Sequence, residues 1–294
     1  MVSIPSEGGV ERSLLSWLDG VGWETHGQDG GQGASVLDET YERSSHQVIY
    51  WDLLAERLVD LNDHVTEDNV DKFLSSLRRD LDADNLIDGN RDFHQLLTKG
   101  KKFSVTLDKG GGSETIYVDL IDYDNPDNNR FHAVNQFSVS RETTIRPDVN
   151  LFVNGIPLVT MELKSLAQDN DWHDAVSDLK DYEDDVPRLF VPGLFNIAAD
   201  TMELRYGSVG APTEFYEPWT DAPKEYTDED NQMKESVQAL CNPGTLLDIL
   251  KHFVFFEKRP GGDAKIVPRH MQYYAVNEIL DRVRKGVHDR GLIW

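Results

Sequence analysis

Arg146-Pro-Asp-Val-Asn-Leu-Phe-Val-Asn-Gly-Ile-Pro-Leu-Val-Thr-Met-Glu-Leu-Lys164 is the stretch that decides the fold of this chain. Two apolar runs rich in β-forming residues, 149–153 and 158–163, flank Asn154-Gly155. Asn-Gly between two such runs is the dipeptide most typical of a tight β-hairpin turn. We therefore expect two antiparallel strands that are buried inside a sheet.

Three ionisable side chains mark the open end of this hairpin. Asp148 opens the first strand, and Glu162 and Lys164 close the second. Because side chains alternate along a strand, Glu162 and Lys164 point to one face and Leu163 points to the other. Carboxylates at the end of a buried run need solvent, a partner or a cation, and Mg²⁺ accepts such oxygen ligands. The sequence thus indicates metal-assisted phosphodiester hydrolysis, in which the lysine orients a water molecule.

Parts of the same pattern occur elsewhere in the chain. Pro126-Asp127, Asp178-Leu-Lys180 and Asp263-Ala-Lys265 each repeat a piece of it, but only 162–164 ends a buried strand. A salt-bridged hairpin end without a catalytic role would explain the same residues. The hairpin alone therefore leaves both interpretations open.

The turn provides a test of the proposed metal site. A strict two-residue turn, counted outward, pairs Asp148 with Met161, so that Asp148 and Glu162 would point to opposite faces. A shared ion requires an offset of one residue in this ladder. We predict a β-bulge between Asp148 and Pro157, because bulges are common beside active sites.

Pro-Asp followed by Glu-x-Lys resembles the PD-(D/E)xK nuclease superfamily. A longer series of segments, in unchanged order, is similar to the nuclease block of the restriction subunit of type I restriction-modification enzymes. These segments are 135–137, 146–148, 152–158, 161–164, 186–190, 204–207, 247–254 and 272–276. The resemblance implies an α/β fold of the restriction-endonuclease type, with a mixed central sheet flanked by helices.

The resemblance also implies roles for individual residues. Asp148 and Glu162 would bind Mg²⁺, or Mn²⁺ in its place, and the main-chain carbonyl of Leu163 would complete the protein ligands. Lys164 would position the attacking water. Glu11 matches a glutamate on an early helix that reaches the metal in many relatives, although a first-turn acid that favours the helix dipole is an alternative.

Candidate DNA contacts lie on two segments. On the helix after the catalytic lysine, the family carries a Gln and, four residues later, a Tyr that help to hold DNA. Tyr182 matches, but Asp178 stands at the Gln position, and it could contact DNA, add a carboxylate near the ion or face solvent. Lys101 and Lys102 are candidate contacts to backbone phosphates, with a solvated surface as the alternative.

The implied domain organisation is a nuclease domain at 1–210, a linker rich in Pro, Asp, Glu and Thr at 211–240, and the start of a helicase-like motor at 241–294. Gly291-Leu-Ile-Trp294 would precede the ATP-binding loop, so we expect a fragment of a longer subunit that binds ATP only in the absent motor. The implied activity is that of a type I site-specific deoxyribonuclease on double-stranded DNA, with modification and specificity subunits as partners. We expect little specific cleavage from the fragment alone. The alternative is a non-catalytic module that docks the motor onto those partners.

The charge of the chain has the wrong sign for a protein that approaches phosphate, since 29 basic and 53 acidic residues give a net charge of −24. One explanation is a halophilic host, where an acidic surface stays hydrated and salt screens the repulsion from DNA. The other is a DNA-mimicking or protein-binding acidic surface. The acids are spread along the whole chain, which favours the halophilic explanation.

The single cysteine, Cys241, excludes an internal disulfide and a zinc site built from several cysteines. Neither a membrane-spanning run nor a signal region is apparent, so we expect a cytoplasmic protein without a membrane partner. Apolar spacing predicts helices at 11–19, in two pieces across 48–81, and at 172–182. It predicts strands at 103–107, 115–121, 131–139, 195–198 and 202–206. Gly27 to Gly33 is expected to be a loop, and His173 to have a surface or packing role.

Overall fold

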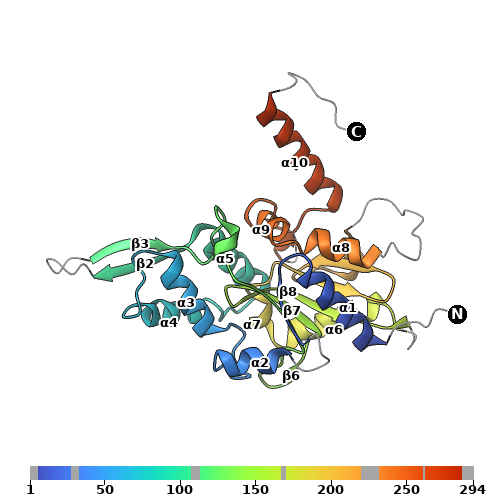
Figure 1. Ribbon diagram of the computed structural model, residues 1–294, viewed down its shortest axis with the longest axis horizontal. Coiled ribbons are helices and arrows are strands. Elements are labelled where there is room, and N and C mark those ends of the chain that lie inside the picture. Colours follow the sequence, from blue (N-terminus) through green and yellow to red (C-terminus); the bar gives the residue numbers. More distant parts are fainter. Residues whose placement is uncertain are drawn as a thin grey trace.

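A mixed sheet lies at the centre of the protein (Figure 1). It has seven strands, in the order β1-β4-β7-β8-β9-β10-β11. The computed structural model describes residues 6–27, 33–106, 113–166, 170–219, 232–260 and 262–286. The β1–β4 and β8–β9 pairs are parallel, and the other neighbouring pairs are antiparallel. The strands are β1 (Glu24–His26), β4 (Phe131–Asn135), β7 (Val149–Val153), β8 (Ile156–Leu163), β9 (Phe195–Ala199), β10 (Leu204–Ser208) and β11 (Glu217–Pro218). The predicted α/β class with a mixed central sheet is confirmed.

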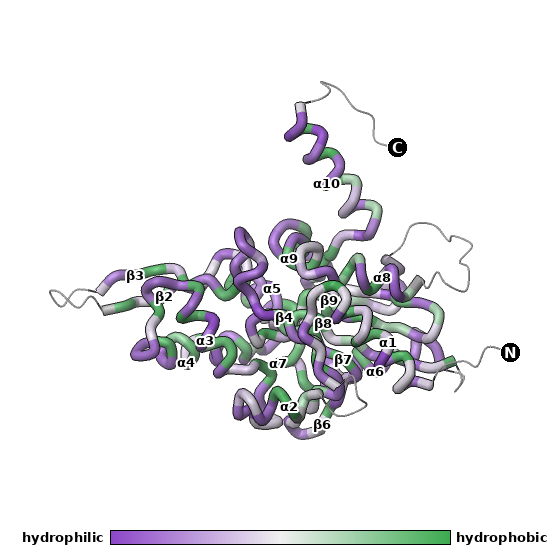
Figure 2. Tube along the Cα trace, viewed as in Figure 1, coloured by the Kyte–Doolittle hydropathy of each residue, from purple (hydrophilic) through white to green (hydrophobic). Residues whose placement is uncertain are grey.

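Every residue of β7 and β8 is buried, so the quoted hairpin is the centre of the core. Hydrophobic residues gather in these central strands, and hydrophilic residues cover much of the surrounding helices (Figure 2). The helices are α1 (Glu7–Asp19), α2 (Gly33–Thr40), α3 (Trp51–Leu61), α4 (Val70–Arg79), α5 (Leu86–Lys99), α6 (Trp172–Asp185), α7 (Pro187–Phe190), α8 (Gln232–Leu240), α9 (Pro243–His252) and α10 (His270–Lys285). Burial of one apolar stripe, as on α1, α3, α4 and α6, explains why these helices pack onto the body of the protein.

The hairpin turn has the geometry that Asn-Gly favours. Asn154 and Gly155 have φ angles of 53° and 81°, as a type I′ turn requires. The Asn154 side chain is fully buried and donates to the Leu120 carbonyl and to Asn129 Oδ1, at 2.9 and 2.8 Å. These hydrogen bonds tie the turn to the neighbouring loops.

The predicted β-bulge is present in the hairpin. Val149 pairs with Met161 and Phe152 with Pro157, and the register shifts between Leu151 and Phe152. β8 therefore carries one residue, Leu158, that has no partner in β7. The Leu158 carbonyl accepts a hydrogen bond from the Leu194 amide at 2.6 Å. One step beyond the Val149 pair, Asp148 lies opposite Glu162, so both carboxylates belong to the same face.

The two strands predicted at 103–107 and 115–121 are present, but they do not join the central sheet. They form β2 (Lys101–Thr106) and β3 (Ser113–Val118), a separate antiparallel pair that projects from one end of the molecule (Figure 1). The first helix begins at Glu7 rather than Glu11, and β1, α2 and α5 were not predicted. The interior of the predicted 27–33 loop lies outside the described residues.

The C-terminal part continues from the central sheet. Within the segment predicted as a linker, β11 pairs with β10, and Trp219 is buried in the core. β12 (Phe255–Glu257) and β13 (Ala264–Ile266) form a small sheet, and α10 then leads away from the body (Figure 1). The predicted domain boundaries stay a prediction, and the segment Gly291-Leu-Ile-Trp294 lies outside the described residues. Within the described ranges, no helix has both the length and the apolar character that crossing a membrane requires.

Candidate active site

The end of the bulged hairpin gathers two carboxylates and a lysine. Asp148 and Glu162 are 7% and 5% exposed, and Lys164 Nζ lies 3.1 Å from Glu162 Oε1. Glu162 pairs across the sheet with Ala198, which packs against Ala175 and Leu179 of α6. The face of the sheet that carries the carboxylates is therefore the face that α6 covers.

Asp148 is held by main-chain and side-chain donors. Its Oδ2 accepts a hydrogen bond from the Leu163 amide at 2.8 Å, and its Oδ1 accepts one from Gln136 Nε2 at 3.2 Å. The main-chain N–H of Gln136 also donates to the main-chain carbonyl of Asp148 at 2.8 Å. Gln136 has a φ of 54°, a left-handed conformation that non-glycine residues rarely adopt outside tightly determined sites.

Glu11 reaches this site from α1. Its Oε1 accepts from Asn135 Nδ2 at 2.8 Å, and its Oε2 accepts from Gln136 Nε2 at 2.7 Å. The side-chain amide of Gln136 thus donates to both Glu11 and Asp148. Sequence reasoning did not find this role for Asn135 and Gln136, although both lie in a segment that carried the resemblance. Glu7 lies one helical turn before Glu11, and its negative charge raises the pKa of Asp148.

Asp178 and Tyr182 lie on α6, which an Asp171 capping box begins. Asp178 Oδ2 is 2.5 Å from Lys164 Nζ, so the ammonium is held between Glu162 and Asp178. Burial, followed by the charges of Glu162 and Asp178, raises the pKa of Tyr182. The sequence did not predict this contact of Asp178 with Lys164, and the three roles that it left open for Asp178 stay predictions.

The pKa values at the site indicate an excess of negative charge. Burial raises the pKa of Asp148 to about 6, and the charges of Glu7 and Glu11 add to this increase. Burial and the neighbouring Asp148 raise the pKa of Glu162 to about 8. Burial opposes the charge on Lys164, but its contacts with Asp178 and Glu162 outweigh that effect and raise its pKa.

The donor set fits a divalent cation. Glu162 Oε2 is buried and has no hydrogen-bond partner among the described residues. A buried carboxylate oxygen without a partner is unfavourable unless a cation or a proton neutralises it. Asp148 and Glu162, two buried carboxylates on one face, offer the hard oxygen ligands that Mg²⁺ takes.

The candidate DNA-contacting lysines lie elsewhere. Lys101 and Lys102 belong to the projecting β2–β3 hairpin, where Lys101 pairs with Asp80 at 2.5 Å. Lys102 Nζ lies 5.7 Å from the centre of the Tyr117 ring. Both lysines thus have contacts within the chain, and their role with DNA stays a prediction. His173 is exposed, stacks on Trp172 and contacts the capping Asp171.

Comparisons with known proteins show which family this chain is similar to. The profile of the family described as "Type I restriction enzyme R protein N terminus" matches residues 4–215. The chain is 31% identical to the type I restriction enzyme HindI endonuclease subunit of Haemophilus influenzae, over 98% of this chain and 28% of the relative. It is 30% identical to a Methanocaldococcus jannaschii protein, provisionally named as the endonuclease subunit of type I restriction enzyme MjaVIIIP, over 82% of this chain and 24% of the relative.

Both relatives are named as endonuclease subunits of restriction enzymes. More particularly, this chain belongs to the family of N-terminal regions of type I restriction enzyme R proteins, because the matched residues make up most of its length. The chain spans about a quarter of the length of the relatives named here.

Proposed function

We propose that this chain carries the Mg²⁺-dependent nuclease centre of a type I restriction enzyme R subunit, which cuts double-stranded DNA. The observation that supports this most is the bulge in the 148–164 hairpin, because it puts Asp148 opposite Glu162 and beside Lys164. An unbulged ladder would have directed the two carboxylates to opposite faces. The family membership supports the same activity independently.

Each side chain then has a defined task. Asp148 and Glu162 hold the ion, and Glu11 and the carbonyl of Leu163 are further candidate ligands. When bound, the ion activates a water molecule and polarises the scissile phosphate. Lys164 is kept protonated by Glu162 and Asp178, so it acts as a hydrogen-bond donor that orients the attacking water rather than as a base. Gln136 keeps Asp148 and Glu11 in a fixed relative position.

The complete enzyme would supply the remaining parts. By the family likeness, residues beyond this chain bind and hydrolyse ATP in a helicase-like motor, and modification and specificity subunits recognise the DNA. In this proposal 1–210 is the nuclease domain, 211–240 connects it to the motor and 241–294 begins the motor. Tyr182, Lys101 and Lys102 are candidate DNA contacts. Isolated from these parts, the chain has little sequence-specific activity.

A second candidate is a docking module that has the nuclease fold but no catalysis. The net charge of −24 favours it, because such a surface repels DNA and suits a protein partner. The buried carboxylates of the candidate active site favour the nuclease, since surface docking does not need them.

Metal titration separates these two functions. We expect Mg²⁺ and Mn²⁺ to raise the melting temperature of the 294-residue chain, because an ion that binds only the folded state stabilises it. Replacement of Asp148 by Asn should weaken Mn²⁺ binding, measured by calorimetry, by about tenfold or more. Asp127→Asn is a matched control, since exposed Asp127 also follows a proline. Equal binding by both variants would favour the docking module.

Replacement of Asp178 tests how the negative charge beside Lys164 affects DNA binding. Asp178→Gln removes one of the two carboxylates at Lys164 and a negative charge near the expected DNA path. We expect roughly threefold to tenfold tighter binding of a short DNA duplex at low salt, measured by fluorescence anisotropy, because less repulsion opposes the phosphates. Asp181→Asn, an exposed site on the same helix, is the control. An equal gain from the control would show only a general charge effect.

A further inference from the structure

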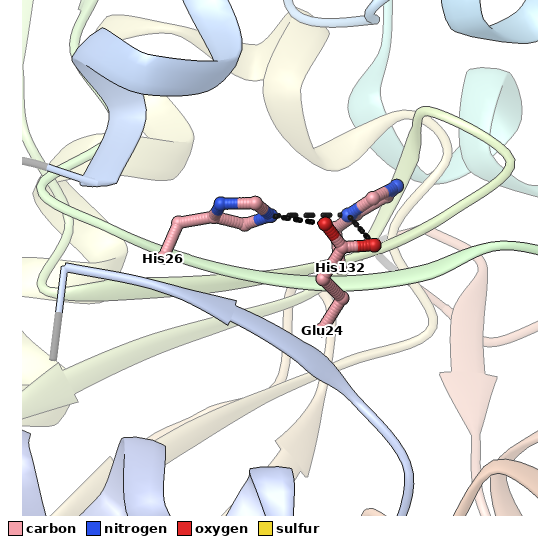
Figure 3. A group of neighbouring side chains, drawn as sticks. All are labelled: Glu24, His26 and His132. Atoms are coloured by element: carbon pink, nitrogen blue, oxygen red, sulfur yellow. Dashed lines mark hydrogen bonds and ion pairs between the residues drawn. The ribbon is translucent and has the colours of Figure 1, made fainter.

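A second cluster of potential metal ligands lies at the β1 edge of the sheet, on a different strand pair from the candidate active site (Figure 3). Glu24 of β1 is the register partner of His132 of β4, so both side chains share one face. His26 is two residues after Glu24 and points to the same face. The parallel pairing of two short strands is what brings a Glu-x-His pattern and a distant histidine together.

The three donor atoms have the spacing of ligands around one ion. His26 Nε2 lies 3.2 Å from His132 Nδ1. The carboxylate oxygens of Glu24 lie 3.7 Å from His26 Nε2 and 3.6 Å from His132 Nδ1. A tetrahedral ion with bonds of about 2.0–2.1 Å keeps its ligand atoms roughly 3.3 Å apart. Small side-chain adjustments therefore suffice to close the site.

We propose that Glu24, His26 and His132 bind one first-row transition-metal ion such as Zn²⁺, at a site separate from Asp148 and Glu162. Two imidazoles and a carboxylate suit these ions. Mg²⁺ prefers a shell of oxygen ligands, so the two sites select different metals. The proposal does not depend on the nuclease activity.

The surroundings of the cluster agree with ligation. His132 is 3% exposed, and its Nδ1 faces the other two donors. Burial lowers the pKa of His132 to about 4 and also lowers that of His26, so both rings are in the neutral form that binds metals. The side chain of Glu24 is 64% exposed, which leaves solvent access for a water as fourth ligand. The positive charge of Arg130 also lowers the pKa of His132, and the same charge would repel a bound cation.

The same contacts also permit a metal-free hydrogen bond between the two neutral rings. In that arrangement one ring nitrogen donates its proton to the other, and Glu24 remains a weak partner at more than 3.5 Å. Ligation and the hydrogen bond make opposite predictions for Zn²⁺ binding, which the experiment below separates.

The ion would have a structural effect. β1 has three residues, lies at the edge of the sheet and pairs with β4. β4 leads into Asn135 and Gln136, which hold Glu11. A metal that joins β1 to β4 would therefore hold the edge strand in the sheet and reduce the mobility of the residues that contact Glu11. An ion that binds only the folded chain also stabilises it.

The test is a calorimetric titration of the 294-residue chain with Zn²⁺ in the presence of excess Mg²⁺. We expect saturable binding of one ion that His26→Gln weakens by about a hundredfold and Glu24→Gln by about tenfold. His64→Gln, an exposed histidine outside the cluster, should bind normally. Both test positions are at least partly exposed, so the variants should fold, and circular dichroism checks this.

Hydrogen exchange gives an independent readout. Zn²⁺ should slow amide exchange in 24–26 of the parent chain and of Asp148→Asn, but not of His26→Gln. Zn²⁺ binding that is lost in Asp148→Asn and kept in His26→Gln would overturn the proposal, as would no binding at all. Because Asp148→Asn and His26→Gln test different sites, failure of this proposal is distinguishable from failure of the nuclease assignment.

Discussion

DNA cleavage by the complete restriction complex is expected to fall by about a thousandfold or more when Lys164 is replaced by alanine, while ATP hydrolysis stays unchanged. Lys164 is the one cation that contacts Glu162 and Asp178 among the described residues, at 3.1 and 2.5 Å. In the proposed mechanism, its removal takes away the donor that orients water, but it leaves both candidate metal-binding carboxylates in position. Supercoiled plasmid cutting and phosphate release, measured on the same complex, provide the two readouts.

Lys180→Ala is the matched control for this experiment. Lys180 ends another acid-x-Lys pattern, at 178–180, but lies on α6, where its Nζ donates to Thr213 Oγ1 at 2.8 Å. We expect its replacement to leave cleavage within about twofold of the parent. Cleavage retained by Lys164→Ala would refute the catalytic role of this lysine.

Glu162→Gln is expected to stabilise the metal-free chain at pH 8 by about 1–2 kcal/mol and to abolish its stabilisation by Mg²⁺. Glu162 is 5% exposed, lies on the same face as Asp148 and has a buried oxygen without a hydrogen-bond partner among the described residues. The folded state therefore holds an unfavourable negative charge that the amide removes without a change of shape. Thermal unfolding in a chelator and in excess Mg²⁺ measures both effects.

The dependence on pH provides the control. The pKa of Glu162 is raised from 4.5 to about 8 in the folded state. A raised carboxyl pKa means that the folded state binds the proton more tightly, so this residue lowers stability as pH rises from about 4.5 to 8. The gain from Glu162→Gln should thus be small at pH 5 and complete above pH 8. A gain that is equal at both pH values, or Mg²⁺ stabilisation that persists in the variant, would contradict the metal-ligand role.

The local pattern of the sequence was sufficient to predict the central hairpin and several of the helices. Alternation and the Asn154-Gly155 turn predicted β7 and β8, and apolar spacing predicted α3, α4 and α6. It also predicted the strands at 101–106 and 113–118, but not that they form a separate pair outside the central sheet. It missed β1, because a three-residue strand with polar side chains has no hydrophobic periodicity to detect.

For the candidate site, residue types and the demand for a shared ion were enough to predict the β-bulge. They were not enough to find the amide of Gln136 between Glu11 and Asp148, which joins residues more than a hundred positions apart. The pairing of Asp178 with Lys164 was likewise open, because it depends on how α6 packs on the sheet.

By itself, the sequence determined the buried hairpin, the acids and lysine at its end, and the excess of negative charge, since these depend on neighbouring residues and on composition. Only the tertiary structure decided which distant side chains share a site. Gln136 bridges Glu11 and Asp148, Asp178 pairs with Lys164, and His26 lies 3.2 Å from His132 because separate strands and helices pack side by side. Such contacts follow from the packing of the whole core, which no local pattern specifies.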